Sequence, residues 1–230
     1  MKFGVVVFPG SNCDHDMIYV LRNILEQDVY ELWHKETSIG KVDAIVLPGG
    51  FSYGDYLRSG AIARYSPIMD SVIGFAGKGG FVFGVCNGFQ ILCEAGLLPG
   101  TLLRNIDQKF ICRNVFIKPD NDCTVLTSLL DKNRSYKIPI AHAEGRYYAG
   151  EDTLREMRQN CQILFRYCDE HGTISGDVNP NGSVENIAGI CNRKQNVYGM
   201  MPHPERAADD ELGNTDGRVV FESILAMLRD

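Results

Sequence analysis

The chain has 230 residues, of which 44% are hydrophobic and 23% are charged, with a formal net charge of −6 at pH 7. A chain of this length can bury roughly 70 to 75% of its unfolded surface, so we expect residues 1–230 to form a single domain. The acidic balance, without clustered Lys and Arg, argues against a nucleic-acid partner. No apolar segment approaches the length that spans a membrane, and the first apolar run is too short for a signal sequence. We therefore expect a soluble, cytoplasmic protein.

Strands alternate with helices in the first half of the chain. The continuous apolar run 3–8 is typical of a parallel strand that is covered on both faces. Apolar residues then recur at helical spacing over 17–25, which predicts an amphipathic helix. Further strands are predicted at 29–33, 44–47 and 81–85, and further helices at 67–78 and 87–95. This alternation predicts an α/β fold with a doubly wound, mostly parallel sheet, whose ligands bind at the carboxyl ends of the strands.

The second half of the chain is richer in short strand-like runs, whose spacing does not reveal their order in a sheet. These runs are 110–118, 136–141, 161–167, 187–191 and 197–201. Apolar residues at helical spacing over 220–228 predict a last helix.

The eight cysteines contain no Cys-x-x-Cys pair, and the chain is too large for a disulfide-stapled small domain. We therefore expect reduced thiols. Five of them lie within or beside apolar runs and are predicted to be small core residues, namely Cys93, Cys112, Cys161, Cys168 and Cys191. The histidines at 15, 34 and 171 lack ligand-like spacing, so the sequence predicts no metal site.

One cysteine, Cys86, lies between Gly84 and Gly88 directly after an apolar run. This pattern is typical of a nucleophile elbow, in which a strand turns sharply into a helix and small neighbours let the strained turn close. An exposed cysteine at a helix N-terminus is favoured as a thiolate by the backbone N–H groups and the helix dipole. The alternative is a buried core cysteine, and the motif alone does not separate the two.

A second motif, His203-Pro204-Glu205, lies near the other end of the chain. The residue before a proline is disfavoured in the helical region, so we expect His203 to be extended, with Glu205 on the same side. The carboxylate can then accept one imidazole N–H and leave the other ring nitrogen for a cysteine. A Pro-rich turn with a solvated glutamate is the alternative. Together, the two motifs indicate a Cys-His-Glu catalytic triad of Cys86, His203 and Glu205.

Four segments that span nearly the whole chain carry a resemblance to a known family. They are 8–14, 47–63, the elbow, and 179–183 together with 201–206. The elbow with its distal His-Pro-Glu resembles the class I, triad-type glutamine amidotransferases. Asn87 directly after the cysteine, and the stretch Gly-Asp-Tyr-Leu-Arg-Ser-Gly-Ala-Ile-Ala at 54–63, are similar to the glutaminase subunits of phosphoribosylformylglycinamidine synthase, an enzyme of purine biosynthesis.

The resemblance implies a flavodoxin-like glutaminase fold and an activity that releases ammonia from glutamine. The backbone N–H of Asn87 is one expected oxyanion donor because it follows the nucleophile, and the resemblance assigns the other to the backbone N–H of Gly50. Gln90 lies one helical turn after the cysteine, and the resemblance assigns it to glutamine binding. The resemblance also places Asn105, Phe110 and Arg113 beside the glutamine pocket, although Arg113 fits a surface ion pair equally well.

His142 lies in a segment that resembles a family segment near the active site, and a hydrogen-bonded structural histidine is an equal alternative.

The chain has no Gly-rich loop of the Walker kind, so we expect no cofactor in it. The resemblance implies a larger synthetase subunit that binds ATP and magnesium and converts formylglycinamide ribonucleotide to formylglycinamidine ribonucleotide, often joined by a third small subunit. The segment 53–60 contains no group that the hydrolysis requires. We expect Tyr56 and Arg58 to lie at the interface with the synthetase, and a lid over the chain's own pocket is the alternative.

Three other functions deserve comparison with this interpretation. The chain could serve as the glutaminase subunit of a different synthetase, or as a cysteine hydrolase of the same fold that does not use glutamine. A non-catalytic interaction module is the third, and the intact triad positions disfavour it. The triad order and Gln90 disfavour the cysteine hydrolase.

Overall fold

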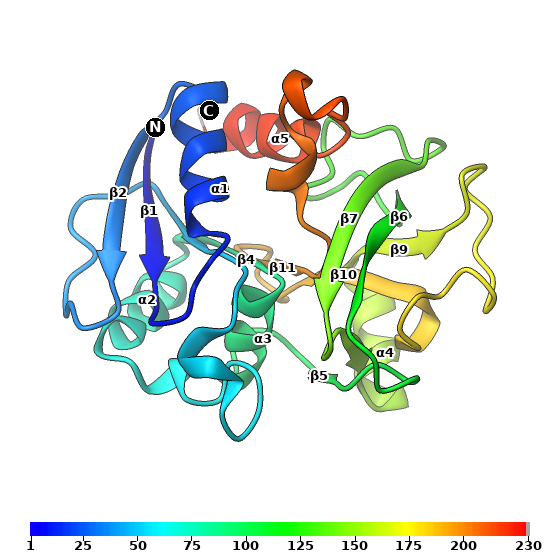
Figure 1. Ribbon diagram of the computed structural model, residues 1–230, viewed down its shortest axis with the longest axis horizontal. Coiled ribbons are helices and arrows are strands. Elements are labelled where there is room, and N and C mark those ends of the chain that lie inside the picture. The colour runs from blue at the N-terminus through cyan, green and yellow to red at the C-terminus, as the bar shows by residue number, and fades with distance from the viewer. Residues whose placement is uncertain (229–230) are drawn as a thin grey trace. The chain divides into compact units, whose positions relative to one another are not determined.

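The structure is a computed structural model that describes residues 1–228, and its contacts divide the chain into two compact units (Figure 1). Unit 1 comprises Met1–Leu98 and Asn196–Gly199, and unit 2 comprises 99–195 and the chain from residue 200 onward. Our expectation of a single domain stays a prediction. None of the helices in residues 1–228 combines the length and the apolar character needed to cross a bilayer.

The sheet of unit 1 is built around four parallel strands. Its order is β2 (Asp28–Trp33), β1 (Lys2–Val7), β3 (Ala44–Leu47), β4 (Phe81–Val85) and β11 (Val197–Met200). The pairs formed by the first four strands are all parallel. Every residue of β3 and β4 is buried, as expected for strands covered on both faces. The predicted α/β fold with a mostly parallel sheet is confirmed.

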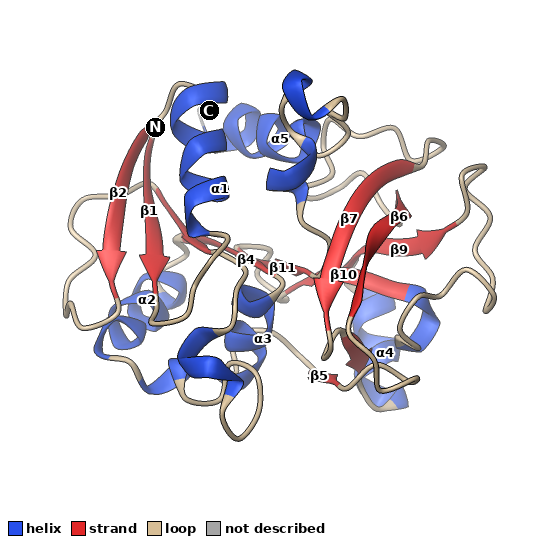
Figure 2. Cartoon of the chain, in the orientation of Figure 1, coloured by secondary structure: helices blue, strands red, loops and turns tan. Residues whose placement is uncertain are grey.

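Helices of unit 1 cover both faces of this sheet. Figures 1 and 2 show α1 (Asp14–Tyr19), which continues into a π-helical turn at Val20–Ile24, on one side, and α2 (Pro67–Gly77) and α3 (Asn87–Glu94) on the other. Short 3-10 turns at Ser52–Asp55 and Ala63–Tyr65 lie between β3 and α2. Each predicted strand and helix of this half is present within two residues, apart from the helix over 17–25, which begins at Asp14.

Unit 2 is built on antiparallel pairing. Its main strands are ordered β10 (Ile187–Cys191), β9 (Ile163–Cys168), β6 (Ile111–Pro119) and β7 (Tyr136–His142), and each neighbouring pair is antiparallel. A small separate sheet pairs β5 (Thr101–Leu103) with β8 (Arg146–Tyr148). The predicted final helix is α5 (Arg218–Leu228). Short 3-10 turns lie at Val184–Asn186, Pro204–Ala207 and Asp210–Leu212.

Sequence reasoning missed α4 (Glu151–Gln159). Only Leu154 and Met157 of this helix are buried, so its apolar stripe is too narrow to stand out. It also missed the three-residue strands β5 and β8, which are too short for a clear alternation of apolar and polar residues.

All eight cysteines are free in the structure, and their reduced state stays a prediction. The prediction that five of them are core residues is wrong for Cys112 and Cys161, which are exposed. Cys112 lies in the exposed first half of β6, and Cys161 lies in the turn before β9 with a φ of 52°. Proximity to an apolar run therefore did not determine burial at the ends of strands.

Candidate active site

Cys86 occupies the junction between β4 and α3. β4 ends at Val85, α3 begins at Asn87, and Cys86 between them has φ 50° and ψ −105°. A non-glycine residue in this left-handed region is strained, which confirms the strained geometry of a nucleophile elbow. The expectation of an exposed cysteine is wrong, because only 5% of its surface is accessible. The cause is the burial of the elements on both sides, since all of β4 and the first six residues of α3 are buried.

The two glycines of the elbow are there for steric reasons. A Cβ on Gly88 would lie 1.9 Å from the carbonyl oxygen of Leu47, and a Cβ on Gly84 would lie 2.7 Å from the backbone of Gly88. No side chain fits at such separations. The glycines thus allow α3 to pack directly on β3 and β4, which places the cysteine at the carboxyl end of β4.

Gly50, the second predicted oxyanion donor, follows β3 in a conformation with φ 145°. A Cβ there would lie 2.8 Å from Cα of Ser11, and the two residues form an isolated antiparallel bridge. The N–H of the next residue, Phe51, donates to the carbonyl of Gly10 at 3.0 Å. The glycine is therefore required by the close approach of the chain at residues 10–12.

A buried hydrogen-bond network links Asn87 and Gln90. The Nδ2 of Asn87 donates to Oε1 of Gln90 at 2.9 Å and to Oδ1 of Asp55 at 3.4 Å. The Oδ1 of Asn87 accepts the backbone N–H of Ser52 at 3.2 Å. Both Asn87 and Gln90 are buried. The structure thus brings together two predicted site residues and adds Ser52 and Asp55, which the sequence analysis did not single out.

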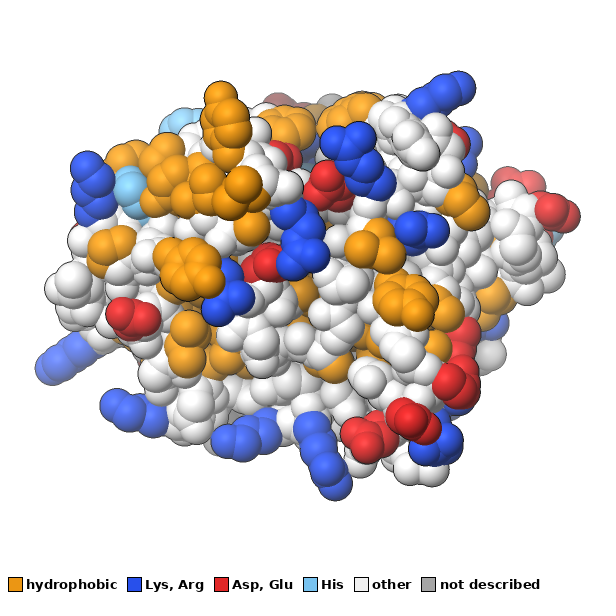
Figure 3. Space-filling model, turned by 90° about the horizontal axis from the view of Figure 1, so that it is seen from below, with side chains coloured by type: hydrophobic (Ala, Val, Ile, Leu, Met, Phe, Trp, Pro, Cys, Tyr) orange, Lys and Arg blue, Asp and Glu red, His pale blue; other side chains and the backbone are white. Residues whose placement is uncertain are grey.

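The two predicted interface residues lie in the loop 51–59 of unit 1. Tyr56 is 74% exposed, whereas the guanidinium of Arg58 forms an ion pair of 2.5 Å with Glu94 at the end of α3. The loop lies at the bottom of Figure 1, and the view from that side shows exposed apolar side chains beside Lys and Arg (Figure 3). Arg58 is thus half-exposed but anchored, and Tyr56 projects into solvent.

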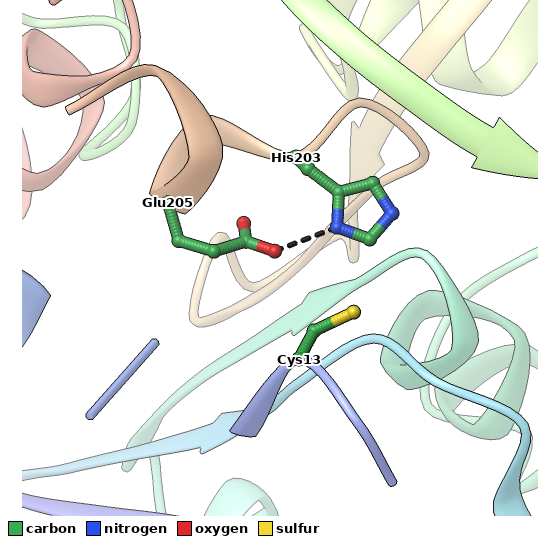
Figure 4. Close-up of side chains that lie close together, drawn as sticks. All are labelled: Cys13, His203 and Glu205. Carbon is green, nitrogen blue, oxygen red and sulfur yellow. Dashed lines mark hydrogen bonds and ion pairs between the residues drawn. The ribbon is translucent and has the colours of Figure 1, made fainter. Parts of the chain in front are cut away.

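His203 and Glu205 form a buried pair in unit 2. The Nδ1 of His203 and the Oε1 of Glu205 are 2.6 Å apart, and both side chains are almost fully buried (Figure 4). His203 has φ −98° and ψ 89°, outside the helical region as its proline neighbour predicts, and its N–H donates to the carbonyl of Pro139 at 2.8 Å. The predicted contact between imidazole and carboxylate is present. It holds the ring in one orientation, with Nδ1 directed to the acid.

Asn105 holds His142 in the same unit. Nδ2 of Asn105 donates to the carbonyls of Lys109 and His142. Its Oδ1 is therefore the acceptor, and it accepts hydrogen bonds from the N–H of Gly145 and the Nδ1–H of His142, each at 3.1 Å. Burial, followed by the charge of His203, lowers the pKa of His142 to about 4. His142 is therefore a neutral, structurally bonded histidine near the His203–Glu205 pair, with its proton on Nδ1.

Phe110 and Arg113 lie at the start of β6. Phe110 is half-exposed, immediately before Ile111, which pairs with His142 across the strands. Arg113 is exposed and lines a shallow surface groove with Asp169 and Glu170. The hydrogen bonds of Asn105 involve neither side chain.

Comparison with known proteins places the chain in a family. A family model of the CobB/CobQ-like glutamine amidotransferase domain matches residues 1–218, and the chain belongs to this family. The phosphoribosylformylglycinamidine synthase subunit PurQ of Salinibacter ruber is 54% identical to it, over 97% of this chain and 95% of that protein. The PurQ subunit of Moorella thermoacetica is 56% identical, over 98% and 95%. A chain in the solved structure of PurLQS from Thermotoga maritima is 41% identical with a TM-score of 0.87, covering 99% of this chain and 98% of that one.

These similarities confirm the predicted family, the class I glutamine amidotransferase fold and the enzyme class. The residue Asp55 could have been found from sequence, because it lies in the stretch 54–63 that marks the subgroup. Its contact with Asn87 was not readable, since the two residues are 32 positions apart.

Proposed function

We propose that the chain hydrolyses glutamine to glutamate and ammonia with Cys86, His203 and Glu205, and delivers the ammonia to a synthetase subunit. That subunit makes formylglycinamidine ribonucleotide for purine biosynthesis. The observation that carries the proposal is the strained Cys86 at the junction of β4 and α3, in a chain of the glutamine amidotransferase family. Relatives over half identical are named as subunits of phosphoribosylformylglycinamidine synthase, which favours this synthetase over others.

The chemistry follows from the roles of three side chains. The Cys86 thiolate attacks the side-chain amide carbon of glutamine, and the C–N bond breaks while His203 gives a proton to the leaving ammonia. Water, deprotonated by the same imidazole, then attacks the thioester, releases glutamate and restores the thiolate. The Glu205 carboxylate accepts a hydrogen bond from the Nδ1–H of His203, which fixes the tautomer and stabilises the imidazolium.

Substrate binding and oxyanion stabilisation come from the main chain and from buried amides. The backbone N–H groups of Gly50 and Asn87 donate to the tetrahedral oxyanion, and Gln90 holds the substrate glutamine. Asn105, Phe110 and Arg113 are proposed to contribute to glutamine binding. Asn105 contributes indirectly, by fixing His142 through the Nδ1 hydrogen bond.

The partner subunit supplies what this chain lacks. We propose that a synthetase subunit binds ATP, magnesium and the ribonucleotide, that a third small subunit completes the complex, and that the complex is cytoplasmic. Tyr56 and Arg58 dock to the synthetase. The exposure of Tyr56 and its neighbour Leu57, 74% and 94%, supports docking through the loop 51–59, because aromatic and Arg residues are enriched at interface hot spots.

The test is synthesis of formylglycinamidine ribonucleotide in the complex reconstituted with Cys86→Ala, supplied with either glutamine or an ammonium salt. Glutamine-dependent synthesis should disappear and ammonium-dependent synthesis should persist, because only ammonia generation is lost. Continued use of glutamine would contradict the role of Cys86. Tyr56→Ala in the same assay should weaken association with the synthetase, measured by titration. Tyr56 is the better position for this test, because a carboxylate at position 58 would lie against Glu94 and disturb the loop itself.

A further inference from the structure

The Asn87 side chain connects the two parts of the proposed oxyanion hole. Its own backbone N–H is one donor, and its Oδ1 accepts the N–H of Ser52, two residues after Gly50, which supplies the other donor. Its Nδ2 donates to Gln90, the proposed glutamine-binding residue. The side chain is buried, so water does not compete for these bonds. The side-chain amide of Asn87 therefore links both proposed oxyanion donors and Gln90, which are proposed to act on the same substrate.

The loop 51–59, which Asn87 holds at Ser52, is strained. Tyr53, Asp55 and Leu57 have φ of 55°, 54° and 69°, and Gly54 between the first two has 69°. Non-glycine residues in this region cost free energy, of order 1–3 kcal/mol each, and persist only where contacts hold them. Three strained residues within the five positions 53–57 indicate a loop whose conformation depends on its anchors.

The anchors of the loop are polar, and several of them reach α3. Oδ1 of Asp55 accepts from Asn87, and Arg58 pairs with Glu94. After the loop, Gly60 packs so closely on the backbone of α3 that a Cβ there would lie 2.8 Å from the nitrogen of Ile91. At the other end, the hydroxyl of Tyr53 lies 2.6 Å from Nδ1 of His34 and 2.8 Å from Oγ of Ser66.

We infer that Asp55 and the Asn87 side chain are positioning residues for glutamine hydrolysis. They hold the loop in its strained conformation and so keep the two backbone donors aligned on the oxyanion. This rests on the proposed function. Because the oxyanion forms only in the transition state, misalignment of the donors lowers kcat and leaves KM nearly unchanged.

The experiment measures glutamine hydrolysis by the reconstituted complex carrying Asp55→Ala, Asp55→Asn or Asn87→Ala. Complete loss of one oxyanion donor costs roughly 10²–10³ in kcat, and misalignment costs less. We expect Asp55→Ala to lower kcat about tenfold with KM within about twofold, and Asp55→Asn, which keeps an acceptor oxygen, to stay within about twofold of the unmodified chain. Asp70→Ala, an exposed carboxylate on α2, is the matched control and keeps full activity.

Coupling is tested by the double variant of Asp55→Ala and Asn87→Ala. Residues that act through one contact are not additive, so the double variant should be no slower than Asn87→Ala alone. Active sites are counted by alkylation of Cys86 with a glutamine-like chloroketone, so that kcat refers to folded, competent sites. If Asp55→Ala does not fold, Asp55→Ser takes its place. The inference then requires that Asp55→Ser lower kcat per titrated site by the same factor of about ten.

Two results separate this inference from the proposed function. If Cys86→Ala is inactive with glutamine while Asp55→Ala and Asp55→Ser keep an unchanged kcat per titrated site, the positioning role is overturned and the glutaminase function stands. An Asp55→Asn variant as slow as Asp55→Ala also overturns it, because the acceptor oxygen would then be irrelevant. If Cys86→Ala still hydrolyses glutamine, the proposed function itself is wrong.

Discussion

The elbow of unit 1 and the His203–Glu205 pair of unit 2 are built by different physical means. Cys86 is placed by the main chain, because the glycines on each side of it let α3 approach β3 and β4 more closely than any side chain allows. His203 is placed by a side chain, because a 2.6 Å hydrogen bond to a buried carboxylate sets the direction of its ring. The proposed nucleophile, built in the first way, is sensitive to added atoms, and the proposed base, built in the second way, is sensitive to lost charge.

The largest effect is expected from breaking the pair in unit 2. His203→Ala removes the group that acts as both acid and base, so it should lower kcat by on the order of 10⁵ to 10⁶. Glu205→Gln should lower kcat roughly 10- to 100-fold less than His203→Ala does, because the carboxylate only orients and stabilises the imidazole. Steady-state hydrolysis of glutamine measures both, with Glu211→Gln, an exposed glutamate of the same unit, as control. A His203→Ala variant that keeps most of its rate would show that another base acts.

An added atom should break the elbow. Gly88→Ala places a Cβ 1.9 Å from the carbonyl oxygen of Leu47, so α3 must move, and we expect a loss of about 3 kcal/mol in the free energy of unfolding. The matched control is Gly74→Ala in α2, where a Cβ meets nothing within 4 Å. This control should gain roughly 0.5–1 kcal/mol from helix propensity and reduced chain entropy. Urea unfolding of both variants measures the difference, and equal stabilities would contradict the steric account.

A stability effect similar in size to that of Gly88→Ala, but spread over more than two pH units, is expected in the pH dependence of unit 2. His142 has a pKa of about 4 in the folded chain and 6.5 as its ordinary value, so between these values the unfolded chain binds more protons and stability rises with pH. This contribution is absent near pH 4 and complete above pH 6.5, and amounts to about 3 kcal/mol. His142→Gln should reduce the rise with pH of the free energy of unfolding, measured by urea unfolding at several pH values between 4 and 6.5.

The control for this pH dependence is His171→Gln, because His171 is exposed. The control should keep the slope of the unmodified chain between pH 4 and 6.5. A His142→Gln variant with an unchanged slope would show that other groups carry the pH dependence.

The sequence predicted the helices and strands of unit 1, but it did not predict the order of the strands in unit 2. Periodicity identified β4 over 81–85 and α3 from Asn87, because apolar runs and helical stripes are local patterns. The antiparallel order β10-β9-β6-β7 was not readable, since strand pairing joins segments far apart in the chain. The burial of Cys86 was missed for a related reason, because burial at the elbow depends on packing of elements that the motif does not include.

By itself, the sequence determined the family, the strained elbow and the contact of His203 with Glu205. The family follows from motifs along the whole chain. The elbow and the His203–Glu205 contact each depend on residues within a few positions, where steric limits and the extended geometry before a proline act directly. Only the tertiary structure showed that Arg58 pairs with Glu94 and that Asp55 contacts Asn87. These contacts join a loop to a helix more than 30 residues away, and they depend on a strained loop conformation that its sequence does not specify.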